Sequence, residues 1–238
     1  RPEDPRGLPD SFIMSLYQDP SRLLWVGTRS GGVSRWNPRS WQMGHFRPAL
    51  ANGLPIAAFA EGRTADETLV GTLGGGLLGV DFSTGAERTL LDTKRGLTDD
   101  RVMSLLRDRQ DRLWIGTFTG GLVRQDANGK LKVFRGAKGS PGALPADGVM
   151  SLFEDRSGNV WVGTFGGGAC RFLETGKFDC STDTGPVGQR LSDTRATALA
   201  EDRQGRIWIG TPGGGLNLLD PLTRQVRIFR RQGPRAQR

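Results

Sequence analysis

The stretch NVWVGTFGGG, residues 159–168, carries the glycines that a phosphate-binding loop would use. A loop of the P-loop type needs Gly-Lys-Ser/Thr leading into a helix, and a dinucleotide fingerprint needs a following helix and a distant acidic residue. After Gly168 the chain reads ACRFLETGKF, which predicts another strand and a hairpin. We therefore interpret these glycines as turn residues and expect no phosphate cofactor.

Other residues that could carry out catalysis are scarce. His45 is the single histidine, so neither a histidine-based triad nor a metal site with histidine ligands can be assembled. Four aspartates recur at one position, at the end of an apolar segment, where their oxygens would accept hydrogen bonds from turn amides; they are Asp19, Asp108, Asp155 and Asp202. An enzyme would break such a repeat at one place, and none is visible. We expect no catalytic residues, no metal and no cofactor.

Two cysteines, Cys170 and Cys180, lie at equal distances from a turn centred near Thr175. A hairpin there would make them a directly opposed cross-strand pair with Cα atoms ~4.5–5.5 Å apart, which permits a disulfide. An oxidised pair would indicate an extracytoplasmic location. Two buried thiols in a reducing compartment are the alternative.

The turn in residues 159–168 is one of five copies of a template. Each copy has an aromatic residue or Leu, then Val or Ile, then Gly-Thr and a small-residue turn, and the copies centre on Trp25, Leu69, Trp114, Trp161 and Trp208. The intervals between them are 44, 45, 47 and 47 residues. Regular self-similarity of this period is the signature of a repeat architecture. We place the repeats at residues 8–50, 51–95, 96–138, 144–184 and 190–233 of a single segment, 1–238.

Each repeat is predicted to form four strands. In the fourth repeat the segments GVMSLFED, VWVGT, ACRF and KFDCS are separated by turn residues, and the second of them is apolar on both faces. A four-stranded meander cannot bury both faces alone, so such sheets must pack on one another. The predicted fold class is all-β: a β-propeller of four-stranded antiparallel blades. Either five blades close by themselves or they form part of a seven-bladed propeller.

The recurring tryptophans Trp25, Trp114, Trp161 and Trp208 are predicted to fill the wedges between blades. The glycine two residues after each would let a neighbouring backbone approach closely. The second repeat has Leu69 instead of Trp and lacks the Asp-x-x-Gly turn. We expect that blade to be the most irregular.

Composition agrees with a soluble, turn-rich β protein, with 36 glycines and 13 prolines among 238 residues. No apolar run is long enough to span a membrane. The net charge is +8, but basic residues stand beside acidic ones, as in LLRDRQDR at 105–112. We interpret this as a solvated surface of mixed charge and expect no nucleic-acid partner.

Residues 144–178, LPADGVMSLFEDRSGNVWVGTFGGGACRFLETGKF, resemble the two-component regulator propeller repeat. That resemblance implies a sensor outside the cytoplasmic membrane of a bacterium, in which propellers precede a membrane helix and a histidine kinase or diguanylate cyclase. It implies that any contact with a membrane is made through a segment not contained in this sequence. The expected localisation is periplasmic.

Ligands of propellers commonly lie over the face that carries the second turn of each blade and the connections between blades. The residues at which we predict ligand contacts on that face are Arg29, Arg101, Phe118, Phe165 and Arg195. Aromatic rings beside Arg and Asp suit a small molecule, a sugar or a peptide.

We therefore predict a ligand-sensing propeller segment of a membrane-anchored signal-transduction protein, without catalysis of its own. A protein-interaction scaffold, including a homodimer, is the alternative, and a propeller lyase or glycosidase is a third hypothesis. A bound small molecule would separate the first two, and a pair of carboxylates in one cleft would be needed for the third.

Overall fold

The computed structural model describes residues 7–40, 42–64 and 66–230. These residues form strands, turns and one short 3-10 helix, η1 (Ala49–Ala51). They divide into two compact units, one ending at Val133 and the other beginning at Phe134. No helix among the residues described is long and apolar enough to cross a membrane.

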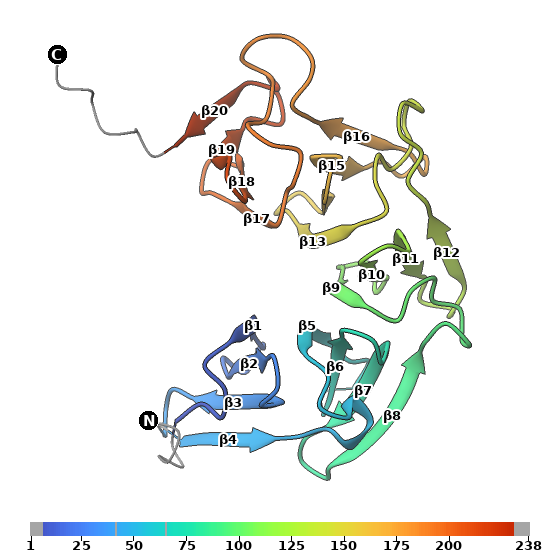
Figure 1. Ribbon diagram of the computed structural model, residues 1–238, viewed down its shortest axis with the longest axis vertical. Helices are drawn as coiled ribbons and strands as arrows, with labels where there is room; N and C mark the ends of the chain where they lie inside the picture. Colours follow the sequence, from blue (N-terminus) through green and yellow to red (C-terminus); the bar gives the residue numbers. More distant parts are fainter. Residues whose placement is uncertain (1–6, 41, 65, 231–238) are drawn as a thin grey trace, which may run out of the picture. The chain divides into compact units, whose positions relative to one another are not determined.

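The first unit holds three four-stranded antiparallel sheets, each a meander of consecutive strands (Figure 1). The first sheet comprises β1 (Ile13–Gln18), β2 (Leu24–Thr28), β3 (Val33–Asn37) and β4 (Gln42–Phe46). The second comprises β5 (Ile56–Glu61), β6 (Glu67–Thr72), β7 (Leu77–Asp81) and β8 (Ala86–Leu91). The third comprises β9 (Val102–Arg107), β10 (Leu113–Thr117), β11 (Leu122–Gln125) and β12 (Leu131–Phe134). The last residue of β12 begins the second unit.

The second unit holds two sheets of the same kind. They comprise β13 (Val149–Glu154), β14 (Val160–Thr164), β15 (Ala169–Phe172) and β16 (Phe178–Ser181), and then β17 (Ala198–Glu201), β18 (Ile207–Thr211), β19 (Gly215–Leu219) and β20 (Val226–Phe229). The predicted all-β fold of four-stranded antiparallel propeller blades is confirmed.

Within each unit the blades pack through their first strands and their apolar faces. β1 lies beside β5, β5 beside β9, and β13 beside β17. One core between the first and second blades contains Trp25, Ile56 and Phe59, and a core between the fourth and fifth contains Trp161 and Ile209. Because the second strands lie between two packed faces, they are apolar on both sides.

Close packing between neighbouring blades explains why a glycine stands two residues after each repeated tryptophan. A Cβ atom on Gly27 would lie 2.5 Å from the carbonyl oxygen of Ile56, and one on Gly163 would lie 2.5 Å from that of Ala196. Both carbonyls belong to the chain that enters the next blade. The predicted close approach of a neighbouring backbone is therefore confirmed at Gly27 and Gly163, whereas Gly210 meets only Ala198 of its own blade.

Three of the four indoles are buried, namely those of Trp25, Trp114 and Trp161. Burial of one such side chain removes about 150–250 Å² from water and stabilises the fold by an upper estimate of about 4–6 kcal/mol. Trp208 is half-buried and stacks on Phe229 of its own blade, with ring centroids 5.4 Å apart. Its strand neighbours Ile207 and Ile209 face the fourth blade, so the indole faces the other side.

The second blade was expected to be the most irregular, and its strand pairing shifts register twice, between Ile56 and Ala58 and between Leu77 and Leu78. Its strands are nevertheless long, with 6, 6, 5 and 6 residues, whereas those of the fifth blade have 4, 5, 5 and 4. The Asp-x-x-Gly motif is missing between β5 and β6. Leu69 fills the position of the indole and is buried, so the sheet keeps its packing.

Candidate functional site

In the first, third and fourth blades the repeated aspartate follows the first strand and accepts a hydrogen bond from the indole of the second strand. We call this arrangement the Asp–Trp lock. Asp19 accepts hydrogen bonds from the backbone N–H of Leu23 (2.9 Å) and from the indole Nε1 of Trp25 (2.8 Å). The Nε1 atoms of Trp114 and Trp161 donate in the same way to Asp108 (2.7 Å) and Asp155 (2.9 Å). These carboxylates accept hydrogen bonds within their own blades, which gives them a structural role.

The bonds to turn amides were predicted, but the bond to the indole was missed. A signal for it exists in the sequence: Asp and Trp stand six residues apart in four repeats and are both absent from the second, which has Gly62 and Leu69. In the fifth blade Asp202 instead accepts from the backbone N–H of Arg206 (3.1 Å) and from its guanidinium.

The opposite end of each blade carries the turn between its second and third strands and the segment that enters its first strand. We call this end the loop face. Backbone hydrogen bonds tie the two segments together, since Arg29 N–H donates to Phe12 O (3.0 Å) and Phe118 N–H donates to Arg101 O (3.0 Å). In the second unit, Phe165 and Arg195 form an isolated antiparallel bridge between the fourth and fifth blades. The turns that bear the predicted ligand residues are therefore rigidly attached to the blades.

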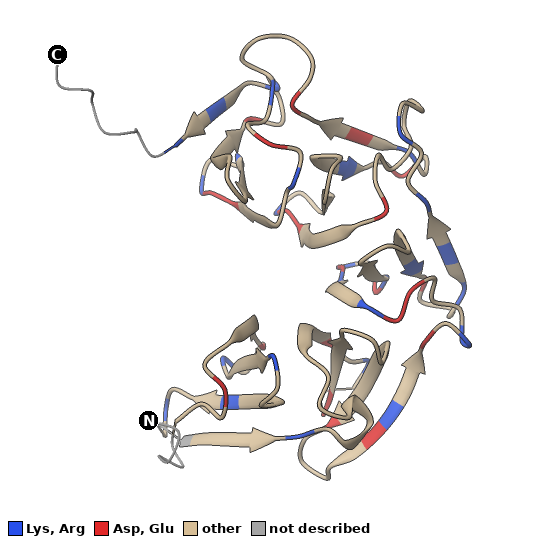
Figure 2. Ribbon diagram, in the orientation of Figure 1, with Lys and Arg blue, Asp and Glu red and all other residues tan. Residues whose placement is uncertain are grey.

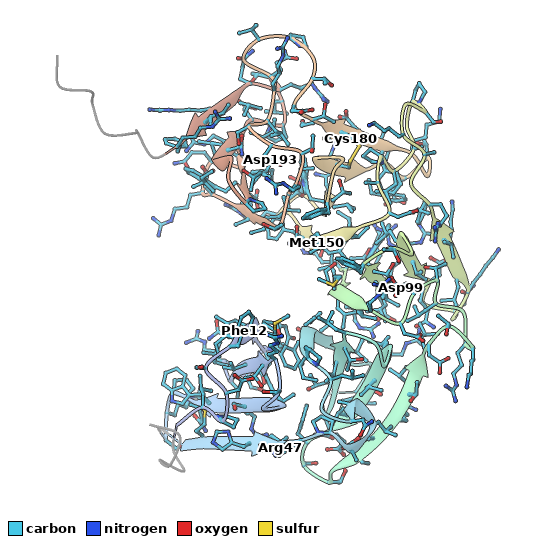
Figure 3. The ribbon with its side chains drawn as sticks, viewed as in Figure 1. Phe12, Arg47, Asp99, Met150, Cys180 and Asp193 are labelled. Atoms are coloured by element: carbon cyan, nitrogen blue, oxygen red, sulfur yellow. A yellow bond between two sulfur atoms is a disulfide. The ribbon has the colours of Figure 1, made fainter. Side chains whose placement is uncertain are left out.

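Aspartates anchor the loop face in the first, third and fifth blades. Asp10 and Asp99 each accept from the backbone N–H two residues later and from the N–H of the second turn, at Ser30 (2.7 Å) and Thr119 (2.8 Å). Asp193 accepts from the backbone N–H of Arg195 (2.9 Å). Figure 3 labels Asp99 and Asp193 in the connections that lead into β9 and β17. Asp10 and Asp99 stand three residues before β1 and β9, and Asp193 stands five residues before β17.

The five residues predicted to contact ligand fall into stacked Arg–Phe pairs. In the first unit the guanidinium of Arg29 lies 5.3 Å from the ring centroid of Phe12, and that of Arg101 lies 4.8 Å from that of Phe118. In the second unit Arg195 lies 5.9 Å from the ring of Phe165. The rings remain accessible, since Phe12, Phe118 and Phe165 are 54%, 43% and 50% exposed.

Two of these three arginines are already neutralised by a neighbouring carboxylate. Arg101 donates through Nε to Asp99 (2.9 Å) and through Nη2 to the hydroxyl of Thr119 (2.8 Å), and Arg195 pairs with Asp193. Burial raises the pKa of Asp99, but the hydrogen bonds from Arg101 and Thr119 outweigh it and hold that pKa well below its ordinary value. Arg29 forms no ion pair within the described ranges. The loop face thus offers flat aromatic rings with fixed donors rather than a strongly cationic surface.

Cys170 and Cys180 face each other across β15 and β16 and are joined by a disulfide (Figure 3). Their Cα atoms are 4.0 Å apart, closer than the spacing expected from an ordinary cross-strand pair. Cys170 is fully buried. The bond links two strands of the blade that most resembles the repeat.

Comparison with a family model matches residues 7–30, 96–119, 143–166 and 190–213 to the two-component regulator propeller. Each matched segment runs from the loop-face connection to the following second turn. The corresponding part of the second blade, which lacks the Asp–Trp lock, is not matched. No curated protein sequence matches the chain.

Solved structures show the same fold at low sequence identity. The extracellular domain of a hybrid two-component system from B. thetaiotaomicron matches with a TM-score of 0.60 and 19% identity over 87% of this chain and 33% of that one. A second extracellular domain from B. thetaiotaomicron, described as a one-component system, matches with a TM-score of 0.54 and 20% identity over 95% of this chain and 36% of that one.

An inactive variant of virginiamycin B lyase from Staphylococcus aureus, crystallised with quinupristin, has a TM-score of 0.69 and 14% identity over 93% of this chain and 71% of that one. The present chain spans about a third of the length of the two B. thetaiotaomicron extracellular domains, 33% and 36%. Four segments of the chain, one in each blade except the second, are thus similar to the two-component regulator propeller repeat.

Proposed function

We propose that this chain is a ligand-sensing segment of a bacterial, membrane-anchored signal-transduction protein, located outside the cytoplasmic membrane and without catalysis of its own. The observation that carries the proposal is the match of four blades to two-component regulator repeats. The disulfide supports an oxidising compartment. Similar folds occur in extracellular domains of such systems.

We place ligand contacts on the loop face of each unit. The Arg–Phe pairs are Arg29 with Phe12 and Arg101 with Phe118 in the first unit and Arg195 with Phe165 in the second, and each presents an exposed ring beside fixed N–H and O–H donors. Rings of this kind stack against sugar or peptide surfaces, and the surrounding polar groups orient them. Because Asp99 and Asp193 neutralise two of the arginines, a neutral sugar or a peptide fits better than a small anion.

Signalling would follow from a difference in ligand affinity between two arrangements of the blades or subunits. A ligand that binds one arrangement more tightly shifts the population toward it and passes that bias to an output domain. The virginiamycin B lyase shares the fold, but fold likeness does not carry activity. The repeated carboxylates of this chain accept hydrogen bonds from indoles and turn amides.

The test is a binding screen of the purified chain against oligosaccharide and peptide arrays, repeated with Phe118→Ala, Phe165→Ala and Arg29→Ala. We expect a bound class whose affinity falls about tenfold or more in these variants. Arg227→Ala is the matched control, since Arg227 also stacks on a phenylalanine (Phe229, 5.0 Å), but on β20 and away from the loop face. Equal losses in the control, or full affinity in all three variants, would remove the proposed site. Binding to no oligosaccharide or peptide on the arrays would remove the support for ligand sensing and favour the scaffold function.

A further inference from the structure

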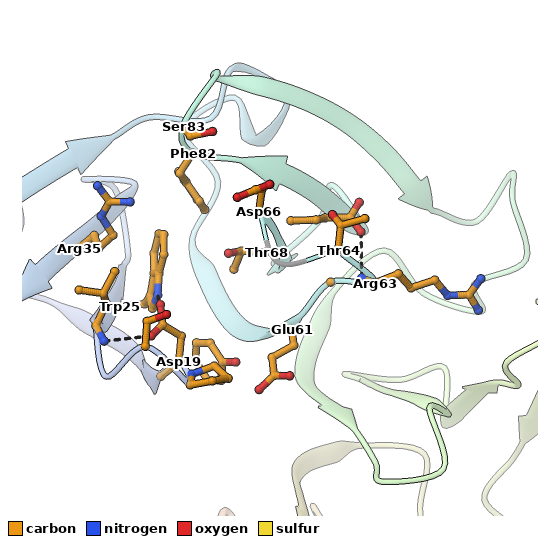
Figure 4. A pocket seen from close by; sticks show the side chains of 16 residues that line it. Asp19, Trp25, Arg35, Glu61, Arg63, Thr64, Asp66, Thr68, Phe82 and Ser83 are labelled. Atoms are coloured by element: carbon orange, nitrogen blue, oxygen red, sulfur yellow. Dashed lines mark hydrogen bonds between the residues drawn. The ribbon is translucent and has the colours of Figure 1, made fainter.

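A cleft of about 420 Å³ lies between the first and second blades, at the end opposite the loop face (Figure 4). Its walls come from β1, β2, β3, residues 61–64 and 66–68, and residues 82–83, all within the first unit. The residues that matter below are Tyr17, Pro20, Arg35, Glu61 and Phe82. Figure 4 shows Arg35 on the wall formed by the first blade and Glu61 on the wall formed by the second.

The second unit contains the same groove between its two blades, and there it is closed. That groove has a volume of only about 10 Å³ and is lined by Trp161, Arg171, Asp179 and Arg224, among others. Arg171 and Arg224 both pair with Asp179, at 3.5 and 2.6 Å. Arg156 pairs with Glu201 at 3.0 Å. The two ion pairs of Asp179 thus fill the closed groove, and the Arg156–Glu201 pair joins the same two blades outside the residues that line it.

Strand register shows why Arg35 has no such partner. Arg35 lies opposite Trp25 as Arg171 lies opposite Trp161, but the next strand places Gly44 where the second unit has Asp179. Arg35 is half-buried and stacks on Trp25 (5.6 Å) and Phe46 (5.5 Å), and it forms no ion pair with any residue that the structure describes. A guanidinium held in this way lacks the carboxylate that its counterpart has.

Glu61 has lost its partner in the same way. Glu61 is the last residue of β5, and Glu201 is the last residue of β17. The two positions are equivalent, because Glu61 lies opposite Thr68 and Glu201 lies opposite Ile207, each one residue before Leu69 or Trp208. The residue that pairs with Glu201 is Arg156, directly after Asp155, whereas the residue after Asp19 is Pro20. Across the part of the chain described, the Glu61 carboxylate forms no ion pair.

A third substitution opens the space itself. Arg224 lines the closed groove, and Gly85 stands at the equivalent position of the second blade. Each comes four residues after an aspartate, Asp220 or Asp81, and each has a left-handed backbone, with φ 61° and φ 76°. In addition Tyr17 replaces Phe153, and its buried hydroxyl lies near the Glu61 carboxylate. Burial, together with the carboxylates of Glu61 and Asp19, raises the pKa of Tyr17, so this group is a neutral donor.

We propose that this cleft binds a small zwitterion, a free amino acid or a short peptide. The ligand carboxylate takes the position of the Asp179 side chain and pairs with Arg35, and the ligand ammonium takes the position of the Arg156 guanidinium and pairs with Glu61. Arg is well suited to bidentate carboxylate recognition, and charge-assisted bonds are the strong ones. The volume lies at the lower end of the range for small-molecule sites. This site is separate from the loop face and does not depend on the proposed sensing function.

The experiment is calorimetric titration of the whole chain with each common L-amino acid and with glycylglycine. We expect at least one to bind, and its N-acetyl and carboxamide derivatives to bind about tenfold more weakly or worse, because each lacks one of the two charges. Gly44→Asp, which supplies Arg35 with the partner that Arg171 has, is expected to weaken binding similarly. A Cβ at Gly44 meets only ring atoms of Phe46 at 3.4 and 3.7 Å, so the variant is accommodated.

Gly85→Arg should close the cleft and abolish binding, whereas Gly85→Asn, which tolerates the same left-handed backbone, should retain it. If no member of the panel binds at millimolar concentration, or if Gly85→Arg binds as well as Gly85→Asn, the proposal is wrong. The derivatives test it in the unaltered chain even if a variant does not fold. Phe118→Ala is expected to leave this binding unchanged, so its outcome is distinct from that of the loop-face screen.

Discussion

At the scale of single residues, aspartate does most of the structural work in this chain. Its carboxylates accept hydrogen bonds from indoles, from turn amides and from the N–H groups of the second turns. In Asp19 and Asp155 one oxygen accepts from backbone N–H groups and the other accepts from the indole. This makes the chain's stability sensitive to the loss of particular carboxylates and to acid.

The lock between Asp155 and Trp161 should be worth more than an ordinary turn bond. Asp155 is 5% exposed and accepts from two backbone N–H groups, the Asn159 amide and the indole. Asp155→Ala leaves these donors buried and unpaired, so we expect a loss of about 3 kcal/mol in the free energy of unfolding, measured by urea denaturation. Asp202→Ala is the control, with an expected loss of about 1 kcal/mol because Asp202 binds no indole. Equal losses would show that the indole bond contributes nothing.

Acid should unfold the protein through the same carboxylates. Hydrogen bonds from Ser83 and Thr84 lower the pKa of Asp81 to about 2, and the pKa of Asp99 is also lowered. A depressed folded-state pKa gives stability that is complete above the unfolded value of about 3.9 and is lost as the pH falls through the folded value. We therefore expect the urea midpoint to be level from pH 7 to about 5 and to fall between about pH 4 and 2.

Asp99→Asn should make that fall shallower, because the variant has one fewer depressed carboxyl to protonate. The exposed Asp183, which makes no side-chain hydrogen bond within the described ranges, provides the control variant Asp183→Asn. A profile of Asp99→Asn that parallels the wild type would argue against the assignment.

At the scale of elements, the repeat works because each second strand carries a tryptophan on one side and a glycine that admits the next blade. A methyl group on Gly163 would meet Ser151 Oγ at 2.1 Å and Ala196 O at 2.5 Å, and the latter is backbone that cannot move freely. Elements of this design tolerate changes in their turns far better than changes at this glycine.

Gly163→Ala is accordingly expected to cost about 2–3 kcal/mol, as overpacking in a tight core does. Gly210 is the same position in the fifth blade, where an added Cβ meets only the Cβ of Ala198 at 3.2 Å. Gly210→Ala should therefore cost well under half as much in the same denaturation assay. A similar cost at both positions would mean that the neighbouring backbone is not the cause.

At the scale of the whole molecule, the net charge of +8 is less significant than it first suggests. Basic and acidic residues are interspersed along both units (Figure 2), and many arginines are paired with neighbouring carboxylates, as Arg101, Arg156 and Arg224 are. Where the described arginines are paired in this way, few of them are free to neutralise phosphates.

We therefore expect only weak binding to duplex DNA at low salt, and none at about 0.15 M salt, measured by fluorescence anisotropy. A basic DNA-binding domain of similar size serves as the positive control. Retention of DNA at physiological salt would show that the charge is organised in a way that the pairs do not reveal.

Much of this fold could be read from the sequence. The five repeats, the strands of the fourth blade, the turn role of the glycines and the opposition of Cys170 and Cys180 follow from spacing and alternation, which are local properties of the chain. Local hydrogen bonding and the two-residue period of a strand dictate them wherever the blade is placed. The positions of Arg101 and Phe118 on one face followed from strand order alone.

What the tertiary structure decided lies between blades and across turns. Only the fold shows that Asp99 neutralises Arg101, that Trp208 is half-buried while Trp161 is buried, and that Gly44, Pro20 and Gly85 together leave Arg35 and Glu61 unpaired. These outcomes depend on which side chains from separate strands and repeats meet in one groove. Packing and pairing over that separation are set by three-dimensional register, which no single repeat encodes.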